Sequence, residues 1–297
     1  MTDVQTVAQT IGVWAPGRHG DVPSLEADVS RAGDPATILF IGDLHLDNPR
    51  ARRPELRRVL DEAVARDAAI VMIGDTFDVM QGRNDRRANK AALAAQYLGR
   101  DDYLNAVLED VTAFLTPYAN NVWMILHGNH ETSVAKHYEV DLVPMLARAL
   151  GPHVVTPGWQ TYVAIRTRSG GKWNMTTYGF VTHGAGGNSP VTKGVIGAAR
   201  RAVTYPDAAF IVSGHLHTEF TIAHPQHRVT QSGRVHNTKQ RHVQVSAWKI
   251  EDSNRPSWAN EKGFPPTLPS AYWCEFYRAR GDNPPQRYQH RFVEAEP

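Results

Sequence analysis

Cysteine is almost absent from this 297-residue sequence, in which Cys274 is the only one. A single cysteine excludes an intrachain disulfide and a thiolate-rich zinc site, so a bound metal would need His, carboxylate or amide ligands. Long apolar runs are absent as well: none approaches the ~20 residues of a membrane-spanning helix, and the N-terminal residues lack the basic start and apolar stretch of a secretory signal. Together these absences predict a cytoplasmic protein with no membrane partner.

A large excess of charge of one sign is also missing. The formal net charge is +2, whereas a nucleic-acid-binding domain usually concentrates basic residues on one face, so the balance neither supports nor excludes a polyanionic partner. Hydrophobic residues make up 41% of the chain, which argues against disorder and predicts a packed core. The 14 histidines are more informative, because several stand beside Gly and Asp at the ends of apolar runs, where metal ligands are expected.

Apolar runs and amphipathic segments alternate along the first half of the chain. Short, partly β-branched runs that end at a polar block predict strands, and apolar residues that recur at helical spacing predict helices. The pattern predicts an α/β protein with a layered sheet, with strands over 37–41, 69–73 and 122–126 and helices over 54–67, 88–115 and 140–150. The second half predicts strands over 162–167, 173–181, 210–213, 243–247, 272–277 and 288–293, with one helix over 191–203.

Two segments stand apart from this alternation. Residues 1–36 contain several Pro and Gly and predict an irregular lead-in, after which 37–297 are expected to form a single domain. Residues 251–270 are rich in Pro, Asn and Ser and predict a long irregular segment inside that domain. Each half of the domain can supply one sheet of a sandwich. The oligomeric state is left open by the sequence.

Five short polar blocks directly follow apolar runs. In open α/β sheets the carboxyl ends of the strands line the ligand crevice, so blocks that are far apart in sequence are expected to converge there. Glycines in front of the polar residues remove side-chain bulk and let the backbone turn sharply and approach a metal closely. In chain order the blocks are Gly42-Asp43-Leu44-His45, Gly74-Asp75-Thr76-Phe77-Asp78, Gly128-Asn129-His130-Glu131, Thr182-His183-Gly184 and Gly214-His215-Leu216-His217.

The residue types in these blocks are those that a pair of divalent transition ions requires. Imidazole suits borderline ions, carboxylate bridges two ions and offsets their charge, and an amide oxygen adds a ligand without charge. Two ions ~4 Å apart can activate a bridging hydroxide and hold the phosphoryl oxygens of an in-line displacement. One such block alone is more often a turn or a core residue, but five in order indicate a two-metal hydrolase.

The blocks also resemble, in the same order, the pattern of the calcineurin-like metallophosphoesterase superfamily: D-x-H, G-D-x-x-D, G-N-H-[ED], H and G-H-x-H. The resemblance covers about 37–217 with no motif missing, and it implies a layered sandwich of two mixed β-sheets flanked by helices. It further implies two divalent metal ions, with Mn favoured over Fe, Zn, Ni and Co, and a bridging role for Asp75. Carried over by position, the ligands of one ion are Asp43, His45 and His217, and those of the other are Asn129, His183 and His215.

The resemblance implies that His130 contacts the phosphate and protonates the leaving group. A His side chain suits general acid catalysis near neutral pH, so we expect His130 and the bridging Asp75 to be the catalytic residues. Asp78 and Glu131 are expected to accept hydrogen bonds from ligand histidines and orient them, rather than to bind metal.

A closer resemblance, to metallophosphoesterases encoded by phages and prophages, rests on the glycine-rich run after His183, on Arg200-Arg201 and on a C-terminal part with Trp, Pro and Lys-Gly. It implies residence in the cytoplasm of a bacterial host. In this run Gly186, Gly187 and Asn188 either form a nest of backbone N–H groups for phosphate oxygens or a turn that leads the chain away.

Basic residues near two of the blocks are candidates for binding the substrate phosphate. Each set has an alternative interpretation, as a solvated helix face or as the charged start of a helix. The candidates are Lys193, Arg200 and Arg201 on the predicted helix over 191–203, and Arg83 and Arg87 just beyond the second block. Trp248 and Trp258 are candidates for base stacking, although most Trp and Tyr are expected in the core.

Several functions stay open at this point. His130 and the basic residues favour a phosphodiesterase acting on nucleic acid or a nucleotide-like diester, whereas a phosphomonoesterase acting on a phosphoprotein or a small metabolite would use the same metal frame. A non-catalytic, metal-stabilised binding module would be marked by degenerate ligands, and all seven ligand positions are intact. An oxygen-activating iron site needs two His and one carboxylate, which leaves four of these positions unexplained.

Overall fold

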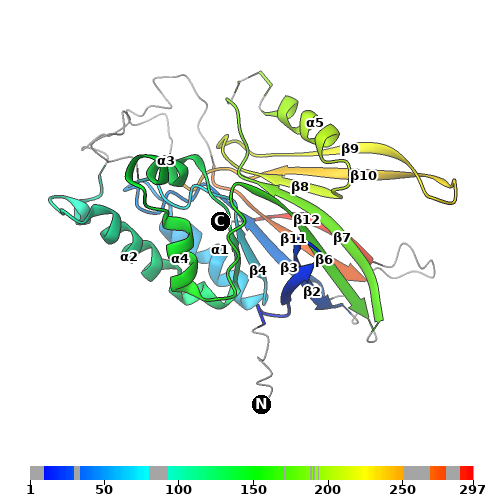
Figure 1. The fold of residues 1–297 in the computed structure, drawn as a ribbon, viewed down its shortest axis with the longest axis horizontal. Helices are drawn as coiled ribbons and strands as arrows, with labels where there is room; N and C mark the ends of the chain where they lie inside the picture. The colour runs from blue at the N-terminus through cyan, green and yellow to red at the C-terminus, as the bar shows by residue number, and fades with distance from the viewer. Residues whose placement is uncertain are drawn as a thin grey trace, which may run out of the picture.

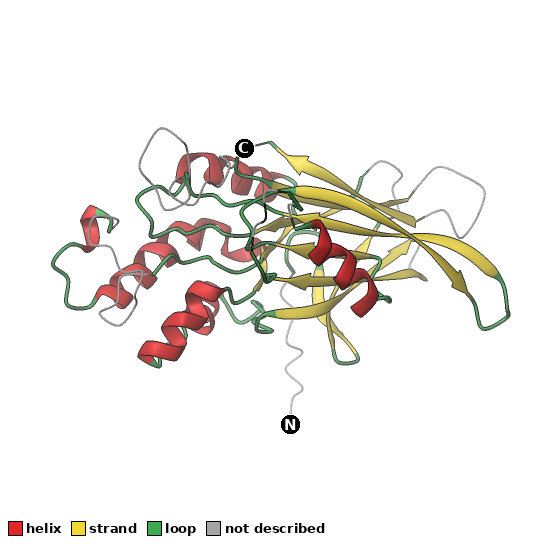
Figure 2. Cartoon of the chain, turned by 90° about the horizontal axis from the view of Figure 1, so that it is seen from above, coloured by secondary structure: helices red, strands yellow, loops and turns green. Residues whose placement is uncertain are grey.

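Two β-sheets pack face to face, with helices on both outer sides (Figures 1 and 2). The structure is a computed structural model that describes residues 10–29, 34–79, 93–169, 172–187, 189, 191–192, 194–250, 268–278 and 288–296. The predicted α/β sandwich of two mixed sheets flanked by helices is confirmed. Within these ranges, no helix has the length and apolar character needed to cross a membrane.

The five-stranded sheet has the order β12-β11-β3-β4-β5. Its strands β3, β4 and β5 are parallel, β11 pairs with β3 in antiparallel fashion, and β12 pairs with β11 in the same way. The three parallel strands are fully buried, which explains why their sequences are continuous apolar runs instead of alternating ones. The strands are β3 Ala36–Ile41, β4 Ala69–Met72, β5 Val122–Ile125, β11 Ala271–Arg278 and β12 Tyr288–Ala295.

The seven-stranded sheet has the order β1-β2-β6-β7-β8-β10-β9. The pairs β2–β6, β7–β8 and β8–β10 are parallel and the others antiparallel. The strands are β1 Ala15–His19, β2 Val22–Asp28, β6 Gln160–Ser169, β7 Lys172–Thr182, β8 Phe210–Ser213, β9 Phe220–Val229 and β10 Val235–Gln244.

Three parts of this topology differ from the sequence-based expectation. The predicted lead-in over 1–36 is not irregular throughout, because β1 and β2 belong to the seven-stranded sheet and Leu25 is fully buried between the sheets. The halves of the chain do not each supply one sheet, since β11 and β12 return to the first sheet. The strand expected over 243–247 is the end of the longer β10, and its partner β9 was not predicted. Of the irregular segment expected over 251–270, residues 251–267 lie outside the described ranges.

Helices cover the two outer faces unequally. The helix expected over 54–67 is present as α1, which begins with a proline in its first turn and buries one apolar face against the five-stranded sheet. Helix α5 covers the outer face of the seven-stranded sheet (Figure 1). The helices are α1 Arg53–Ala65, α2 Tyr103–Leu115, α3 Asn129–Tyr138, α4 Leu142–Leu150 and α5 Val195–Thr204, with short 3-10 helices η2 Ala95–Tyr97 and η3 Thr116–Asn121.

Aromatic side chains fill the space between the two sheets. Phe210 on β8 packs edge to face with Phe40 on β3, with ring centroids 5.9 Å apart, and Phe276 lies in the same buried cluster. Gly179 makes room for this packing, because a Cβ there would lie 2.2 Å from the ring of Phe210. Each buried aromatic side chain contributes roughly 2 kcal/mol, so this layer holds the sheets in a fixed relative position.

Six strands end at one edge of this sandwich: β3, β4 and β5 of the first sheet, and β7, β8 and β10 of the second. Hydrogen bonds join the sheets there: among them, His183 Nδ1 donates to Ile73 O at 2.8 Å, and His215 N donates to Asp43 Oδ2 at 2.9 Å. The five polar blocks all follow strands at this edge, as the sequence predicts.

Candidate metal centre

Backbone hydrogen bonds tie together the loops that follow β3 and β4. Asp43 N donates to Gly74 O and His45 N to Asp75 O, both at 3.0 Å. Five of the seven expected ligand residues have left-handed backbone: the φ values are 52° at Asp43, 45° at His45, 48° at Asp75, 74° at His215 and 55° at His217. Such conformations are unfavourable for non-glycine residues and persist at functional sites, where the surrounding structure enforces them.

Asp43, His45 and His217 form the first ligand cluster, with their ligand atoms within 4.8 Å of one another. His45 Nε2 lies 3.4 Å from His217 Nε2, and His217 Nε2 lies 3.5 Å from Asp43 Oδ1. Asp43 and His45 are fully buried, whereas the His217 side chain is 22% exposed. The three residues that the resemblance assigns to one ion are therefore adjacent in space.

Asn129, His183 and His215 form the second cluster, beside Asp75. Asn129 Oδ1 lies 3.1 Å from His183 Nε2 and 2.8 Å from His215 Nδ1, and these two ring nitrogens are 3.3 Å apart. Asp75 Oδ2 is 3.5 Å from His183 Nε2. The residues that the resemblance assigns to the second ion are likewise brought together.

The hydrogen bonds around the second cluster indicate what fits at its centre. His183 donates its Nδ1–H to Ile73 O and His215 its Nε2–H to Gly186 O, so the other nitrogen of each ring, His183 Nε2 and His215 Nδ1, faces inward. With the amide oxygen of Asn129, three possible ligand atoms converge within 3.3 Å of one another. Imidazole nitrogens that have no proton and an amide oxygen are ligands of divalent transition ions, so this set of atoms fits such a metal.

Two glycines make the close approach of the carboxylates possible. A Cβ at Gly128 would lie 2.0 Å from Asp75 Oδ1, and one at Gly214 would lie 2.4 Å from Asp43 Oδ2. Contacts of this length do not occur, so any side chain at these positions would displace a carboxylate. The expectation that glycines remove bulk beside the ligands is confirmed.

Asp78 contacts two histidines, and with His45 and His130 it forms a third group whose possible ligand atoms lie within 4.8 Å of one another, so its role as an orienting residue instead of a ligand stays a prediction. Its Oδ1 is 3.0 Å from His45 Nδ1, which leaves His45 Nε2 directed at the first cluster. Its backbone carbonyl accepts from His130 Nδ1 at 2.6 Å. Burial acts to raise the pKa of Asp78, but His45 and Lys249 outweigh burial and hold it well below its usual range.

Asn48 and Lys249 complete the surroundings of Asp78, and neither was predicted. Asn48 Nδ2 donates to Asp78 Oδ2 at 2.8 Å, and Lys249 Nζ donates to Asp78 Oδ1 at 3.2 Å. Lys249 reaches this position because Trp248 N donates to Asp43 O and the backbone of Lys249 pairs with Ala51. Only this tertiary pairing brings the lysine near the site, so no local motif could have revealed it.

Glu131 does not orient a ligand histidine, which corrects the expectation. Its carboxylate instead accepts from backbone N–H groups, from Gly128 at 2.8 Å, Phe77 at 3.0 Å and Asp75 at 3.2 Å. Glu131 is the third residue of α3, a helix that was not predicted, and a Glu three residues after the Gly that precedes a helix is a start signal that could have revealed it. Burial and the charge of Asp75 raise the pKa of Glu131 to about 7.

His130 lies on the first turn of α3, next to both clusters. Its backbone N donates to Asp75 Oδ1 at 3.0 Å, and its Nε2 is 3.7 Å from Asp75 Oδ2. Its ring packs edge to face against that of His45, with centroids 4.7 Å apart. Because Nδ1 donates to the Asp78 carbonyl, Nε2 is the ring nitrogen of His130 that can exchange a proton with a substrate.

Opposite charges balance within the site. Burial acts to raise the pKa of Asp75, but His130 and His183 outweigh burial and hold it well below its usual range. Burial acts to lower the pKa of His183, but Asp75 and Asp43 outweigh burial and raise it to about 9. The buried carboxylates are therefore ionised and call for positive charge beside them.

One side of the site is open to solvent. Asn129, His215 and His217 are half-buried, whereas Asp43, His45, Asp75 and His183 are at most 1% exposed. Gly186 and Gly187 lie exposed on the open side, where the carbonyl of Gly186 accepts from His215. Phosphate binding by the N–H groups of Gly186 and Gly187 stays a prediction.

The other expected substrate residues have mixed outcomes. Arg83, Arg87, Asn188, Lys193 and Trp258 lie outside the described residues. Arg200 is exposed on α5, whereas Arg201 is half-buried under that helix and donates to Ser213 Oγ at 3.2 Å. Trp248 is fully buried, so the stacking role considered for it is wrong.

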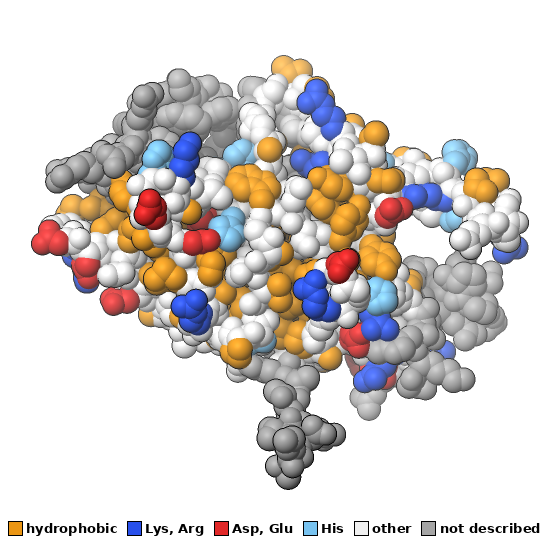
Figure 3. All heavy atoms as spheres, in the orientation of Figure 1, with side chains coloured by type: hydrophobic (Ala, Val, Ile, Leu, Met, Phe, Trp, Pro, Cys, Tyr) orange, Lys and Arg blue, Asp and Glu red, His pale blue; other side chains and the backbone are white. Residues whose placement is uncertain are grey.

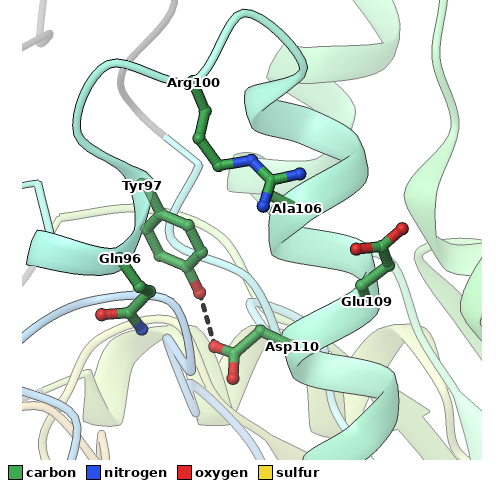
Figure 4. Close-up of a pocket in the computed structure, with 6 residues that line it drawn as sticks. All are labelled: Gln96, Tyr97, Arg100, Ala106, Glu109 and Asp110. Atoms are coloured by element: carbon green, nitrogen blue, oxygen red, sulfur yellow. Dashed lines mark hydrogen bonds between the residues drawn. The ribbon is translucent and has the colours of Figure 1, made fainter.

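A separate pocket of about 360 Å³ lies between η2 and α2 (Figure 4). Gln96, Tyr97, Arg100 and Asp110 line it, and the Tyr97 hydroxyl donates to Asp110. None of the residues in the five polar blocks lines this pocket. The candidate site is therefore identified by its ligand clusters and not by cavity size.

Comparisons with known proteins identify a family. Residues 36–219 match the family model of calcineurin-like phosphoesterases. A protein of Streptococcus pneumoniae TIGR4 described as a predicted phosphoesterase superimposes with a TM-score of 0.33 at 12% identity, covering 87% of this chain and 89% of that one. Vps29 of Chaetomium thermophilum gives 0.32 at 10% identity, covering 89% and 100%. No curated protein matches the chain by sequence.

The family match includes all five polar blocks and all seven expected ligand positions. It spans more than half of the chain, from the start of β3 to just beyond His217. The His and Asp clusters that it contains suit a divalent metal, and the chemistry of the family is hydrolysis of a phosphate ester. The chain belongs to the calcineurin-like phosphoesterase family and is a metallophosphoesterase.

Proposed function

We propose that this protein is a dinuclear metal-dependent phosphodiesterase that acts on nucleic-acid or nucleotide-like diesters. The observation that carries the proposal is the convergence of two ligand clusters at one edge, with His130 beside both. A diester has two groups on phosphorus, and the open side at His215 and His217 leaves room for the second one. We also propose that the protein is related to phage-encoded enzymes and that it resides in the cytoplasm of a bacterial host.

Each ion has its own set of proposed ligands. Asp43, His45 and His217 would hold one, Asn129, His183 and His215 the other, and Asp75 would lie between them. Mn is favoured, because the carboxylate and amide oxygens among these ligands suit it. When bound, such ions supply a hydroxide nucleophile near neutral pH and offset the charge of the phosphoryl group.

The side chains of this site have three proposed tasks: they bind the metals, hold one another in position and donate a proton to the leaving group. His130, fixed through Nδ1 by the Asp78 carbonyl, presents Nε2 to the leaving oxygen and donates a proton to it as the ester bond breaks. Asp78 holds His45 in the ring orientation that its role requires. Glu131 holds the backbone of the loops around Asp75, so the ligand positions are set before substrate arrives.

Hydrolysis of two generic esters tests the proposal. Protein stripped with EDTA and resupplied with Mn²⁺ is assayed on bis-p-nitrophenyl phosphate and on p-nitrophenyl phosphate, alongside Asp75→Ala. We expect metal-dependent cleavage of the diester that Asp75→Ala abolishes. Cleavage of the monoester alone would make the protein a phosphomonoesterase, and bound metal without turnover on either ester would favour a binding module.

A further inference from the structure

Asp47 is a buried carboxylate that the proposed mechanism does not use. It lies two residues after His45, on the loop that follows β3, and is 5% exposed. Most charges lie outside instead, and Figure 3 shows Lys and Arg side chains interspersed with Asp and Glu on one face. Among the described residues, Asp47 belongs to none of the three groups whose possible ligand atoms converge. A buried carboxylate is unfavourable unless hydrogen bonds satisfy it, so its partners indicate what it does.

Three donors converge on the Asp47 carboxylate. Its Oδ1 accepts from Asp78 N at 2.5 Å, and its Oδ2 accepts from Val79 N at 2.9 Å and from the Tyr103 hydroxyl at 3.3 Å. Asp78 ends the second polar block, so the carboxylate joins the loop after β3 to the end of the loop after β4. Hydrogen bonds from backbone N–H groups to a carboxylate are about twice as strong as those between neutral groups.

Val79 has a backbone conformation that its surroundings enforce. Its φ is 36°, in the left-handed region, which is unfavourable for a β-branched residue. Its side chain is 4% exposed and belongs to the core between the helices and the five-stranded sheet, while its N–H is bound by Asp47. Core packing and the carboxylate together hold the peptide group between Asp78 and Val79 in one orientation.

The same peptide group also binds His130. Its carbonyl, Asp78 O, accepts from His130 Nδ1 at 2.6 Å, while its N–H donates to Asp47 Oδ2. This peptide is trans and planar, and its C=O and N–H point in opposite directions, so Asp47 and His130 bind its two ends. A negative charge at the N–H end polarises the peptide group, which strengthens its carbonyl as an acceptor. Asp47 is thereby coupled to the His130 ring through one peptide group.

The loop around Asp47 is itself held by hydrogen bonds. Leu46 N donates to Thr76 O at 3.0 Å, and Leu46 O accepts from Arg53 Nε at 3.0 Å and from Arg53 Nη2 at 2.8 Å. Arg53 in turn forms an ion pair with Asp110 on α2. The carboxylate therefore has a fixed place before substrate binds, which a group that positions another group requires.

We propose that Asp47 is a positioning residue for His130: through the peptide group after Asp78 it holds the ring as the Nδ1–H tautomer, which leaves Nε2 to exchange the proton with the leaving group. The inference rests on the proposed function, in which His130 donates that proton. In Ser-His-Asp hydrolases a carboxylate bonded directly to the catalytic His holds its tautomer and orientation. Here a peptide group lies between carboxylate and ring, so we expect loss of the carboxylate to lower turnover about 10-fold, less than loss of the ring.

Leaving groups of different basicity test the inference kinetically. Asp47→Asn replaces an acceptor oxygen by an amino group that cannot accept from a backbone N–H. Protein loaded with Mn²⁺ is assayed on bis-p-nitrophenyl phosphate and on diphenyl phosphate, whose phenolate is a poorer leaving group and depends more on proton donation. For Asp47→Asn we expect kcat to fall about 10-fold on diphenyl phosphate and less on the nitrophenyl ester, with KM and metal content unchanged.

Two further variants show whether Asp47 acts through His130. In the double variant that combines Asp47→Asn with His130→Ala, kcat should equal that of His130→Ala alone, because residues that act as a unit are not additive. The matched Glu275→Gln alters a carboxylate that is also 5% exposed but pairs with Thr37, at the end of β3 away from the metal ligands, and should retain kcat on both esters. Thermal melting shows whether each variant is folded. If Asp47→Asn is not, Asp47→Glu displaces the same oxygens by one methylene and should give the same selective loss.

The state of the His130 ring tests the inference without turnover. Heteronuclear NMR spectra of Zn²⁺-loaded protein with isotope-labelled His identify the protonated ring nitrogen of His130, whose signals are those absent from His130→Ala. We expect the Nδ1–H tautomer in the unsubstituted protein and a mixture with the Nε2–H tautomer in Asp47→Asn.

Each outcome bears on one of the two proposals. An unchanged His130 tautomer in Asp47→Asn, an equal loss on both esters, or a further loss in the double variant would overturn the role of Asp47 and leave the proposed function standing. A changed tautomer in a protein that hydrolyses no diester would support positioning by Asp47 and overturn the proposed function.

Discussion

The two ligand clusters at the sheet edge are held by different kinds of partner. In the first cluster a carboxylate, Asp78, stands behind His45, and Asp43 adds a second carboxylate. In the second cluster backbone carbonyls stand behind His183 and His215, the amide of Asn129 is the additional ligand, and Asp75 Oδ2 lies 3.5 Å from His183 Nε2. The partner behind the ring is therefore charged for His45 and neutral for His183 and His215, so we expect the two clusters to hold a cation with unequal strength.

This difference shows that sequence motifs of similar appearance can place their histidines in different hydrogen-bonding surroundings. D-x-H and G-H-x-H each supply His ligands, yet the residue behind each ring is set by packing and not by the motif. We expect one ion to remain bound under conditions that remove the other. Four substitutions break or sharpen this comparison.

Asp75→Ala should have the largest effect, because Asp75 Oδ2 lies 3.5 Å from His183 Nε2 in the second cluster and the residue is joined to His45 of the first cluster through its backbone carbonyl. We expect turnover to fall to background and the content of both metals to drop, as measured by hydrolysis of the generic diester and by mass spectrometry of bound metal after dialysis. The conservative Asp75→Asn, which keeps the shape but not the charge, serves as its control. Full activity in either variant would disprove the assignment of Asp75.

His215→Ala should empty the second cluster only. We expect metal content to fall from two ions per chain to one and turnover to be abolished, because His215 Nδ1 is one of three possible ligand atoms that converge there. Metal content separates this variant from Asp75→Ala even though both lack activity. Retention of two ions would show that His215 is not a ligand.

His130→Ala should leave both clusters intact. We expect two ions per chain and a turnover number lower by about 10²-fold, the loss typical of removing a general acid. The affected quantity should be kcat more than KM, because the proton moves in the reaction and not in binding. A drop in metal content would instead make His130 part of the metal frame.

Asp78→Asn should have the smallest effect on turnover, and it should weaken the binding of one metal ion only. Loss of the carboxylate behind His45 is expected to weaken the first ion by about 10 to 100-fold, while the second ion is unaffected. The substitution keeps the backbone carbonyl that holds His130, so proton donation should persist once metal is saturating. Titration with Mn²⁺ in a chelator buffer measures the two affinities, and equal weakening of both would refute the inequality of the clusters.

Much of the fold was predictable, because its central strands are unbroken apolar runs. Val122–Ile125 and Ala69–Met72 are recognisable in sequence since parallel strands are buried on both faces. The lead-in strands were not predictable in the same way: β1 and β2 contain Pro and Gly and become strands only by pairing with each other and with β6. The helix α3 begins inside a polar block, so its start was hidden by the motif.

The sequence by itself determined which residue types stand at the strand ends and in which order, because each block follows a strand whose end the apolar pattern marks. Only the tertiary structure decided which ring nitrogen faces inward, that Lys249 and Asn48 meet at Asp78, that Arg201 packs under α5, and that Asp47 binds the peptide group after Asp78. The physical reason is that these features depend on contacts between strands far apart in sequence, and local patterns carry no information about such contacts.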